Sequence, residues 1–221
     1  MILELPLTHL YRPADPVADA PWLLVLLHGV GSNEADLFGL APAIPGPFHV
    51  LSLRAPFQMG PNAFGWFTFA VRPDGHRMID AEQELTSRTL LAQVISSSAE
   101  QLSVPLERVV VGGFSQGGIM SLSLLLTRPE LMAAALVMHC RLLPEVVPSM
   151  APVAALQGRR LWVSHGTTDQ VIPLASAQGI RAHVQDLPIE LSYAEFPGGH
   201  EIRPAELTAA MTWLNSLQAS S

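Results

Sequence analysis

Cysteine and charged residues are both scarce in this chain, and each scarcity excludes a class of protein. Cys140 is the single cysteine among 221 residues, so no intrachain disulfide can form and a reducing compartment is favoured. Only 14% of the residues are charged, and the net charge is −7. A chain of this charge without a basic stripe is not expected to bind nucleic acid.

Long apolar runs and a secretory leader are also missing. The longest apolar stretches, such as residues 22–27 and 131–138, are far shorter than the roughly 20 residues that span a bilayer. The first residues lack the basic start and the apolar stretch of a signal peptide. We therefore expect a cytoplasmic protein with no integral membrane segment, in which Cys140 is an inert buried thiol.

Apolar residues are plentiful, at 49% of the chain, and their pattern indicates the fold class. The expected strands cover residues 22–28, 49–53, 109–113, 133–139, 160–165 and 189–196, with an edge hairpin from 3–5 and 8–11, and the expected helices cover 34–40, 81–102, 115–127, 174–186 and 204–217. Runs rich in Val and Leu are typical of strands buried on both faces. The sequence thus predicts one α/β domain over residues 1–221, with a mostly parallel sheet and helices on both faces.

Residues 54–80 interrupt this alternation. The segment is rich in Pro, Gly and aromatic residues, and it follows the end of a predicted strand. Because a connection this long is usually functional, we expect it to form one wall of a substrate groove.

Gly113-Phe114-Ser115-Gln116-Gly117 is the most informative segment, since it lies between a predicted strand and a predicted helix. G-x-S-x-G in this context predicts a nucleophile elbow, a tight turn that lifts the serine hydroxyl above the sheet. The flanking positions must be small because strand and helix approach closely there, and glycine meets that need. The alternative is a glycine-rich turn with an incidental serine.

Two residues after other strands complete a candidate triad. Asp169 follows strand 160–165, where an acid can orient a histidine; its alternative role is to cap the next helix. His200 follows two glycines after strand 189–196 and suits a general base; its alternative is a surface-loop histidine. The chain order Ser115, Asp169, His200 is that of α/β-hydrolase triads, which favours the catalytic interpretation of all three.

The loop after the strand at 22–28 offers half of an oxyanion hole. It reads His28-Gly29-Val30-Gly31 and can turn a backbone N–H toward a substrate carbonyl. The N–H of Gln116, which follows the predicted nucleophile, would supply the other half. His28 itself is expected to be a structural hydrogen-bonding residue, because His200 already takes the place of the base.

These motifs together resemble the phospholipase/carboxylesterase family of small α/β-hydrolases, which includes acyl-protein thioesterases and bacterial carboxylesterases. The likeness runs from about residue 22 to the C-terminus. It implies an α/β-hydrolase fold, and the absence of a large insertion argues against a cap domain. It also implies the same triad, backbone donors at Val30 and Gln116, and an acyl-binding groove near Trp66 and Val171.

The chain departs from the family pattern in ways that favour the bacterial esterase branch. Thr167 stands where eukaryotic thioesterases usually carry an aspartate, and His139-Cys140 stands where Ser-Gly or Ser-Cys is common. Arg141 replaces a groove-lining aromatic of some thioesterases, which argues against long acyl-protein substrates. Arg141 is either a contact for a polar or anionic substrate end or a solvated loop residue. For His139 a structural role is favoured over one at the site.

The sequence therefore predicts a serine hydrolase that cleaves carboxylic esters of short-to-medium acyl chains. The alternatives are an acyl-thioesterase or lysophospholipase acting on longer chains, and a non-catalytic binding protein on a hydrolase fold. The expected partner is a small-molecule ester, and a homodimer is left open. Neither cofactor nor metal is expected, since H-E-x-x-H is missing after His200, where residue 204 is proline.

Overall fold

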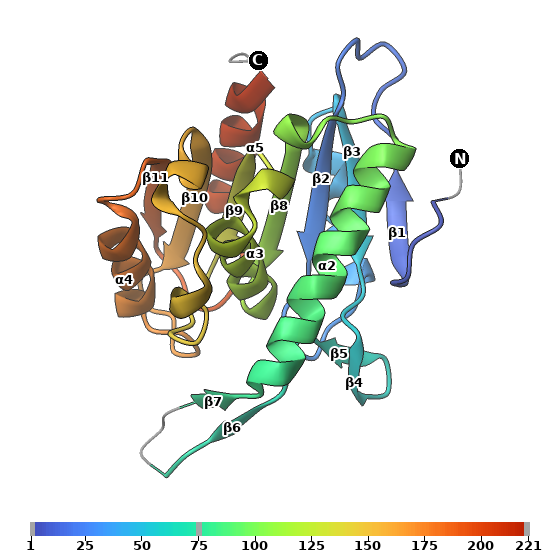
Figure 1. The fold of residues 1–221 in the computed structure, drawn as a ribbon. Coiled ribbons are helices and arrows are strands. Elements are labelled where there is room, and N and C mark those ends of the chain that lie inside the picture. Colours follow the sequence, from blue (N-terminus) through green and yellow to red (C-terminus); the bar gives the residue numbers. More distant parts are fainter. Residues whose placement is uncertain (1–2, 74–76, 219–221) are drawn as a thin grey trace.

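The computed structural model describes residues 3–73 and 77–218, and its centre is a seven-stranded sheet in the order β1-β3-β2-β8-β9-β10-β11 (Figure 1). The strands are β1 (His9–Arg12), β2 (Trp22–Leu27), β3 (Phe48–Leu53), β8 (Val109–Phe114), β9 (Ala134–Met138), β10 (Arg159–Gly166) and β11 (Ile189–Phe196). β1 is antiparallel to β3, and all other neighbours are parallel. The carboxyl ends of the parallel strands therefore meet at one edge of the sheet.

Helices cover both faces of this sheet, as the sequence predicts. One face carries α2 (Ala81–Gln101), α3 (Gln116–Thr127) and α4 (Leu174–Val184), and the other carries α1 (Ala35–Phe38) and α5 (Pro204–Gln218) (Figure 1). Successive residues of β2 enter the two apolar cores in turn: Leu23 packs beneath the first set of helices, and Leu24 packs beneath the second. In the described part of the chain, no helix has the length and apolar character needed to cross a bilayer.

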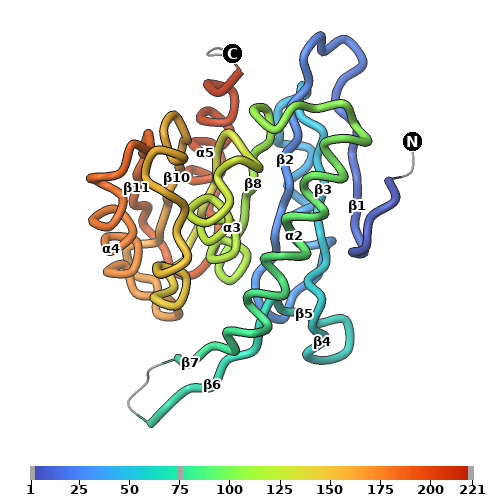
Figure 2. Tube along the Cα trace, in the orientation of Figure 1, coloured from blue at the N-terminus to red at the C-terminus, as the bar shows by residue number. Residues whose placement is uncertain are grey.

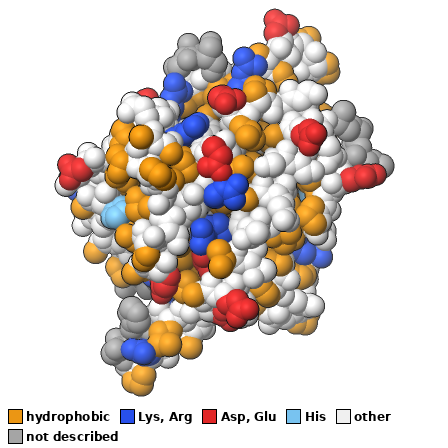
Figure 3. Space-filling model, in the orientation of Figure 1, with side chains coloured by type: hydrophobic (Ala, Val, Ile, Leu, Met, Phe, Trp, Pro, Cys, Tyr) orange, Lys and Arg blue, Asp and Glu red, His pale blue; other side chains and the backbone are white. Residues whose placement is uncertain are grey.

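Residues 54–80 contain more regular structure than the predicted loop. They form two short antiparallel pairs, β4 (Phe57–Gly60) with β5 (Ala63–Gly65) and β6 (Phe69–Val71) with β7 (Arg77–Ile79). The β6–β7 pair projects away from the sheet (Figures 1 and 2). Hydrophobic side chains gather on this projection (Figure 3), among them Phe69, Val71 and Met78, which are all exposed.

The predicted edge hairpin is wrong. Residues 3–5 form no strand, and β1 pairs with β3 instead of with a neighbouring segment. The reason is burial: Leu3 and Leu7 pack into the core on the α2 side. This packing holds the segment against the sheet without strand-to-strand hydrogen bonds. The other predicted strands and helices are present with small shifts at their ends, except that the helix expected at 34–40 shortens to Ala35–Phe38.

Candidate active site

Ser115 occupies a strained turn between β8 and α3. Its backbone has φ 55° and ψ −116°, a region that residues with a Cβ seldom adopt. The glycines on either side allow the close packing that this turn requires. A Cβ on Gly113 would lie 2.3 Å from the carbonyl carbon of Gly117, and one on Gly117 would lie 1.8 Å from the backbone oxygen of Leu27. The local geometry is therefore that of a nucleophile elbow.

Three residues from three strand ends form one hydrogen-bonded line. Ser115 Oγ lies 2.9 Å from His200 Nε2, and His200 Nδ1 lies 2.7 Å from Asp169 Oδ2. Because Asp169 can only accept, His200 donates from Nδ1 and presents Nε2 to the serine hydroxyl. The hydroxyl and the imidazole are thus arranged for proton transfer from serine to histidine.

The loops that carry Asp169 and His200 are joined along their backbones. Thr168 donates to the carbonyl of Gly198 from both its N–H and its hydroxyl, each at 2.9 Å. A Cβ on Gly166 would lie 2.3 Å from the carbonyl oxygen of Gly199, so only glycine permits this approach. The end of β10 therefore fixes the position of the turn that carries His200.

The Asp169 carboxylate has acceptor bonds on both oxygens. Oδ1 accepts from the backbone N–H groups of Val171 at 2.8 Å and Ile172 at 2.9 Å, while Oδ2 accepts from His200 and also from His139 Nδ1, at 3.1 Å. Burial alone would raise the pKa of Asp169, but these bonds outweigh it and lower the pKa to about 2. The carboxylate therefore stays ionised throughout the neutral range.

A buried network behind Asp169 is the part of the site that the sequence did not predict. His139 is 1% exposed; its Nδ1 faces Asp169, and its Nε2 lies 3.1 Å from Glu206 Oε2. Glu206 is equally buried and accepts a hydrogen bond from Ser164 Oγ at 2.6 Å. The sequence holds one weak signal for this network, an acidic residue on the apolar face of the last helix. His139 lies behind the triad and not at its rim.

Carboxylates on both sides favour the charged form of His139. Burial by itself would lower the pKa of His139, but Glu206 and Asp169 more than offset this and raise it. His139, Asp169 and His200 also place potential metal-ligand atoms within 4.8 Å of one another. The ring nitrogens and carboxylate oxygens of these residues already take part in the hydrogen bonds described above. The three side chains therefore form a hydrogen-bonded network.

Val30 and Gln116, whose backbone N–H groups are the predicted oxyanion donors, lie beside Ser115. Gln116 is the first residue of α3, so its N–H has no acceptor within the helix. The N–H of Val30 has no hydrogen-bond acceptor among residues 3–73 and 77–218. Gly29 brings this loop against the elbow, since a Cβ there would lie 3.4 Å from Ser115 Cβ. The two donors predicted from the sequence thus come from the loops that adjoin Ser115.

A small cavity opens directly at Ser115. Its volume is about 30 Å³, and it is lined by Val30, Phe67, Phe69, Arg77, Ile79, Ser115, Gln116, Ile119, Arg141 and Ile172. A groove of about 400 Å³ shares Arg77, Arg141 and Ile172 with it and continues along Gln170, Val171, Pro173 and Ser176. The β6–β7 pair therefore forms one wall of this region, as expected for the segment 54–80.

Two of the three residues predicted to line the groove do so, and the third does not. Val171 is 46% exposed and lines the groove, and Arg141 lines both the cavity and the groove. Trp66 is not in the groove: it is fully buried, and its indole N–H donates to the carbonyl of His28 at 2.9 Å. The side chain of Gln116 accepts a hydrogen bond from the N–H of Trp66 and donates one to the carbonyl of Phe67, and it is Phe67 that lines the cavity.

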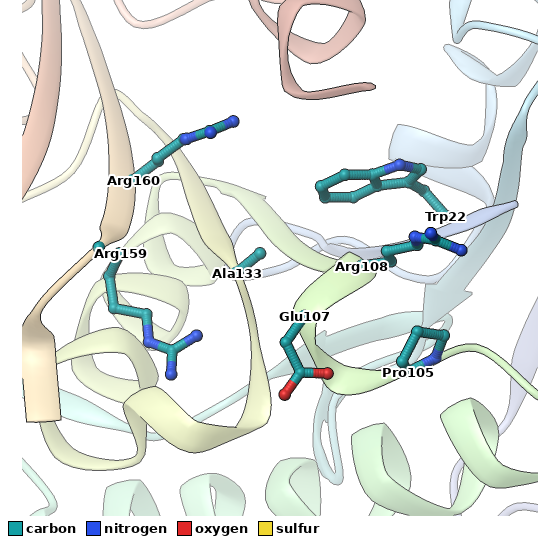
Figure 4. A pocket seen from close by; sticks show the side chains of 8 residues that line it. Trp22, Pro105, Glu107, Arg108, Ala133, Arg159 and Arg160 are labelled. Carbon is teal, nitrogen blue, oxygen red and sulfur yellow. The ribbon is translucent and has the colours of Figure 1, made fainter. Parts of the chain in front are cut away.

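A larger cavity lies away from this chemistry. It has a volume of about 450 Å³ and is found where β2, β8, β9 and β10 begin, at the opposite edge of the sheet (Figure 4). Arg159 and Arg160 are neighbours on β10, and their side chains diverge in Figure 4, with Arg160 toward the top of the view and Arg159 toward the bottom. The charged groups of this larger cavity therefore do not converge on one point, and the candidate site is the smaller cavity at Ser115.

Two residues near the site serve structural roles. His28 is fully buried; its Nδ1 donates to the carbonyl of Gly29 at 2.7 Å, and its Nε2 accepts from the N–H of Ala55 at 3.1 Å. These contacts fix one neutral tautomer, in agreement with the expectation for His28. Cys140 is fully buried, and burial raises the pKa of its thiol, which keeps it in the unreactive form.

Comparison with known proteins gives a consistent family and fold. Residues 12–218 match the family model described as Phospholipase/Carboxylesterase. A Bacillus subtilis (strain 168) protein named "Putative hydrolase MhqD" is 26% identical over 192 residues, which cover 86% of this chain and 91% of that protein. Acyl-protein thioesterase 1 of Mycosarcoma maydis is 30% identical over 171 residues, or 67% of this chain and 69% of that protein. The Bacillus cereus carboxylesterase structure has the same fold, with a TM-score of 0.81 at 21% identity over 96% of this chain and 95% of that chain.

Proposed function

Because the chain belongs to the phospholipase/carboxylesterase family and is a hydrolase, we propose that it cleaves carboxylic esters with short-to-medium acyl chains. Ser115 is the nucleophile, His200 is the general base, and Asp169 orients His200. The observation that carries the proposal is the line of contacts at 2.9 Å and 2.7 Å through both nitrogens of His200. No other serine hydroxyl among the described residues is hydrogen-bonded to a histidine.

The first step is attack on the ester carbonyl. His200 Nε2 takes the proton of Ser115 as Oγ bonds to the carbonyl carbon, and Asp169 stabilises the resulting imidazolium. The carbonyl oxygen becomes an oxyanion that accepts hydrogen bonds from the N–H groups of Val30 and Gln116. Collapse of this tetrahedral species breaks the ester bond, and the alcohol leaves with the proton from His200.

The second step is hydrolysis of the acyl-enzyme. Water takes the place of the alcohol, gives a proton to His200, and attacks the acyl carbonyl while the same N–H groups hold the oxyanion. Ser115 then leaves and recovers its proton. The groups named here carry out both steps, and they require neither a metal nor a cofactor.

Cavity size supports the choice of short-to-medium acyl chains. About 30 Å³ is available beside Ser115, and Phe67, Ile119 and Ile172 bound it, so a short apolar group fits best. The open groove of about 400 Å³ can take a longer group outside this cavity.

Thioester hydrolysis is the second candidate. The observation that favours it is the relative named acyl-protein thioesterase 1, which is 30% identical to this chain. Esters and thioesters use the same nucleophile and oxyanion donors, so rates on a matched ester and thioester with one acyl chain decide between them. A binding protein without activity is the candidate of a different class, and failure of Ser115 to react with a fluorophosphonate would favour it.

The test is the rate on p-nitrophenyl esters from acetate to palmitate, with Ser115→Ala as the blank. We expect the wild-type kcat/KM to peak at short or medium chains, to resist EDTA, and to fall at least about a thousandfold in Ser115→Ala. Ser98→Ala is the matched control, because Ser98 is a buried serine whose hydroxyl bonds only within α2. Hydrolysis that survives in Ser115→Ala would remove Ser115 from the mechanism, and a rate that climbs to palmitate would favour the longer-chain alternative.

A further inference from the structure

Positive charge gathers at the reactive serine of a protein that is acidic as a whole. The chain has a net charge of −7 and contains no lysine, so all twelve of its basic residues are arginines. Two of them, Arg77 and Arg141, line the cavity that holds Ser115, and both also line the adjoining groove. In the described part of the chain, neither cavity nor groove has an acidic residue in its lining.

Arg141 has no polar partner in the part of the chain that the structure describes. It makes neither an ion pair nor a hydrogen bond there, although its side chain is half-buried. Glu145 is the acidic group that acts on it most, yet the two form no ion pair. Burial lowers the pKa of the Arg141 guanidinium, Glu145 opposes this, and the nearby charge of Arg77 adds to the lowering. A half-buried guanidinium without a hydrogen-bond partner is strongly stabilised when an anion binds to it.

Arg77 is held in place beside the same space. Its guanidinium donates to the carbonyl of Val171 at 3.1 Å and lies over the ring of Phe69, 5.3 Å from its centre. These contacts use one face and one donor, so the remaining donors of this five-donor group stay available. The arrangement differs from that of arginines such as Arg54 and Arg88, whose guanidinium groups are paired with Glu34 and Glu84.

We propose that Arg141 and Arg77 form a subsite for a carboxylate of the substrate, so that the enzyme prefers esters carrying a negative charge near the scissile bond. The inference rests on the proposed function, since the subsite is defined by its place beside Ser115. Guanidinium groups bind carboxylates through paired N–H donors, and two of them can share one anion. A solvated loop arginine, the alternative for Arg141, would lie in open water and not in the lining of the reactive cavity.

Two matched pairs of esters test the subsite. 4-Acetoxybenzoate against 4-acetoxybenzamide places the charge on the leaving group, and monomethyl adipate against methyl adipamate places it on the acyl group. In each pair the members differ by a carboxylate against a neutral amide of similar shape. We measure kcat/KM for each ester by absorbance or pH-stat with wild type, Arg141→Gln and Arg77→Gln. Arg128→Gln is the control for net charge, because Arg128 is exposed and pairs with Glu130.

The expected result is a wild-type preference for the anionic member of at least one pair. In Arg141→Gln, kcat/KM for that member falls about tenfold while the neutral member changes less than about twofold, and added salt weakens the preference. Arg77→Gln lowers the same preference, and Arg128→Gln leaves it unchanged. Equal loss on both members, or a preference that survives in Arg141→Gln, would overturn the inference. If wild type hydrolyses neither p-nitrophenyl acetate nor any of the four esters faster than Ser115→Ala, the proposed function fails and this inference fails with it. If wild type hydrolyses p-nitrophenyl acetate but shows no charge preference within either pair, the inference alone is overturned.

Discussion

Asp169 serves two histidines at once. Its Oδ2 accepts hydrogen bonds from His200 at 2.7 Å and from His139 at 3.1 Å, and Glu206 faces the other ring nitrogen of His139. The two carboxylates therefore favour the imidazolium form of His139 and raise its pKa. A positive charge on His139 weakens the electrostatic stabilisation that Asp169 gives to a proton on His200. The side chains of Glu206, His139, Asp169 and His200 are therefore electrostatically coupled.

Replacing His139 should move the pH dependence of catalysis. In His139→Gln, Asp169 loses a positive neighbour and acts more strongly on His200, so we expect the acidic limb of the kcat/KM profile to move to higher pH by roughly one unit. The groups that face His139 are Asp169, Glu206, and the rings of His165 and His200, at 5.2 Å and 5.7 Å. The measurement is kcat/KM on p-nitrophenyl acetate between pH 5 and 9.

Ser164→Ala is the matched control for this prediction. It removes a neutral hydroxyl that donates to Glu206 and leaves His139, Glu206 and Asp169 in place, so the acidic limb should not move. A purely structural role for His139 predicts a lower rate in His139→Gln with the limb unmoved. That outcome would contradict the electrostatic coupling.

At the scale of elements, close contact between neighbouring elements places the proposed catalytic groups. α3 begins directly after Ser115 and packs so tightly on the end of β2 that a Cβ on Gly117 would meet the carbonyl of Leu27 at 1.8 Å. This contact lies in backbone that cannot move without shifting β2, and β2 leads into the loop that carries Val30. The elbow and one of the two proposed oxyanion donors are thus positioned by the same packing.

Gly117→Ala should damage both stability and activity. We expect the free energy of unfolding to fall by roughly 1–3 kcal/mol, because the added methyl group must displace backbone, and we expect ester hydrolysis to fall with it. Gly179→Ala is the control: Gly179 lies within α4, and a Cβ there meets nothing within 4 Å, so alanine should stabilise the helix by up to about 1 kcal/mol. Urea denaturation and p-nitrophenyl acetate assays measure both effects. Equal stability of the two variants would show that the contact at Gly117 does not constrain the elbow.

Much of this element-level arrangement can be predicted from the sequence, for a physical reason. Strands buried on both faces appear as continuous apolar runs, and the residues after such strands must meet at one sheet edge, which is how Ser115, Asp169 and His200 come together. Contacts that depend on packing across that edge leave no local pattern. The pairing of His139 with Glu206 on α5, the burial of Trp66 and the pairing of β1 with β3 are of this kind.

At the scale of the whole molecule, the two edges of the sheet differ in kind. The edge where the parallel strands end carries the hydrogen-bonded line, the two unpaired N–H groups and both site arginines. The edge where they begin has the larger cavity, but its arginines diverge (Figure 4). Size alone would select the cavity at the opposite edge, whereas the convergence of a serine hydroxyl, an imidazole and backbone N–H groups favours the smaller cavity as the active site.

The proposed mechanism requires Ser115 to react as a covalent nucleophile, and intact-protein mass spectrometry of the labelled chain detects this reaction. The whole chain is treated with a fluorophosphonate, weighed, and then digested to locate the adduct. We expect one adduct per chain, on the peptide that contains Ser115, with loss of esterase activity in proportion to labelling and no adduct on Ser115→Ala. An adduct on a different residue that accounts for the loss of activity, or full activity in a chain labelled at Ser115, would contradict the proposed mechanism.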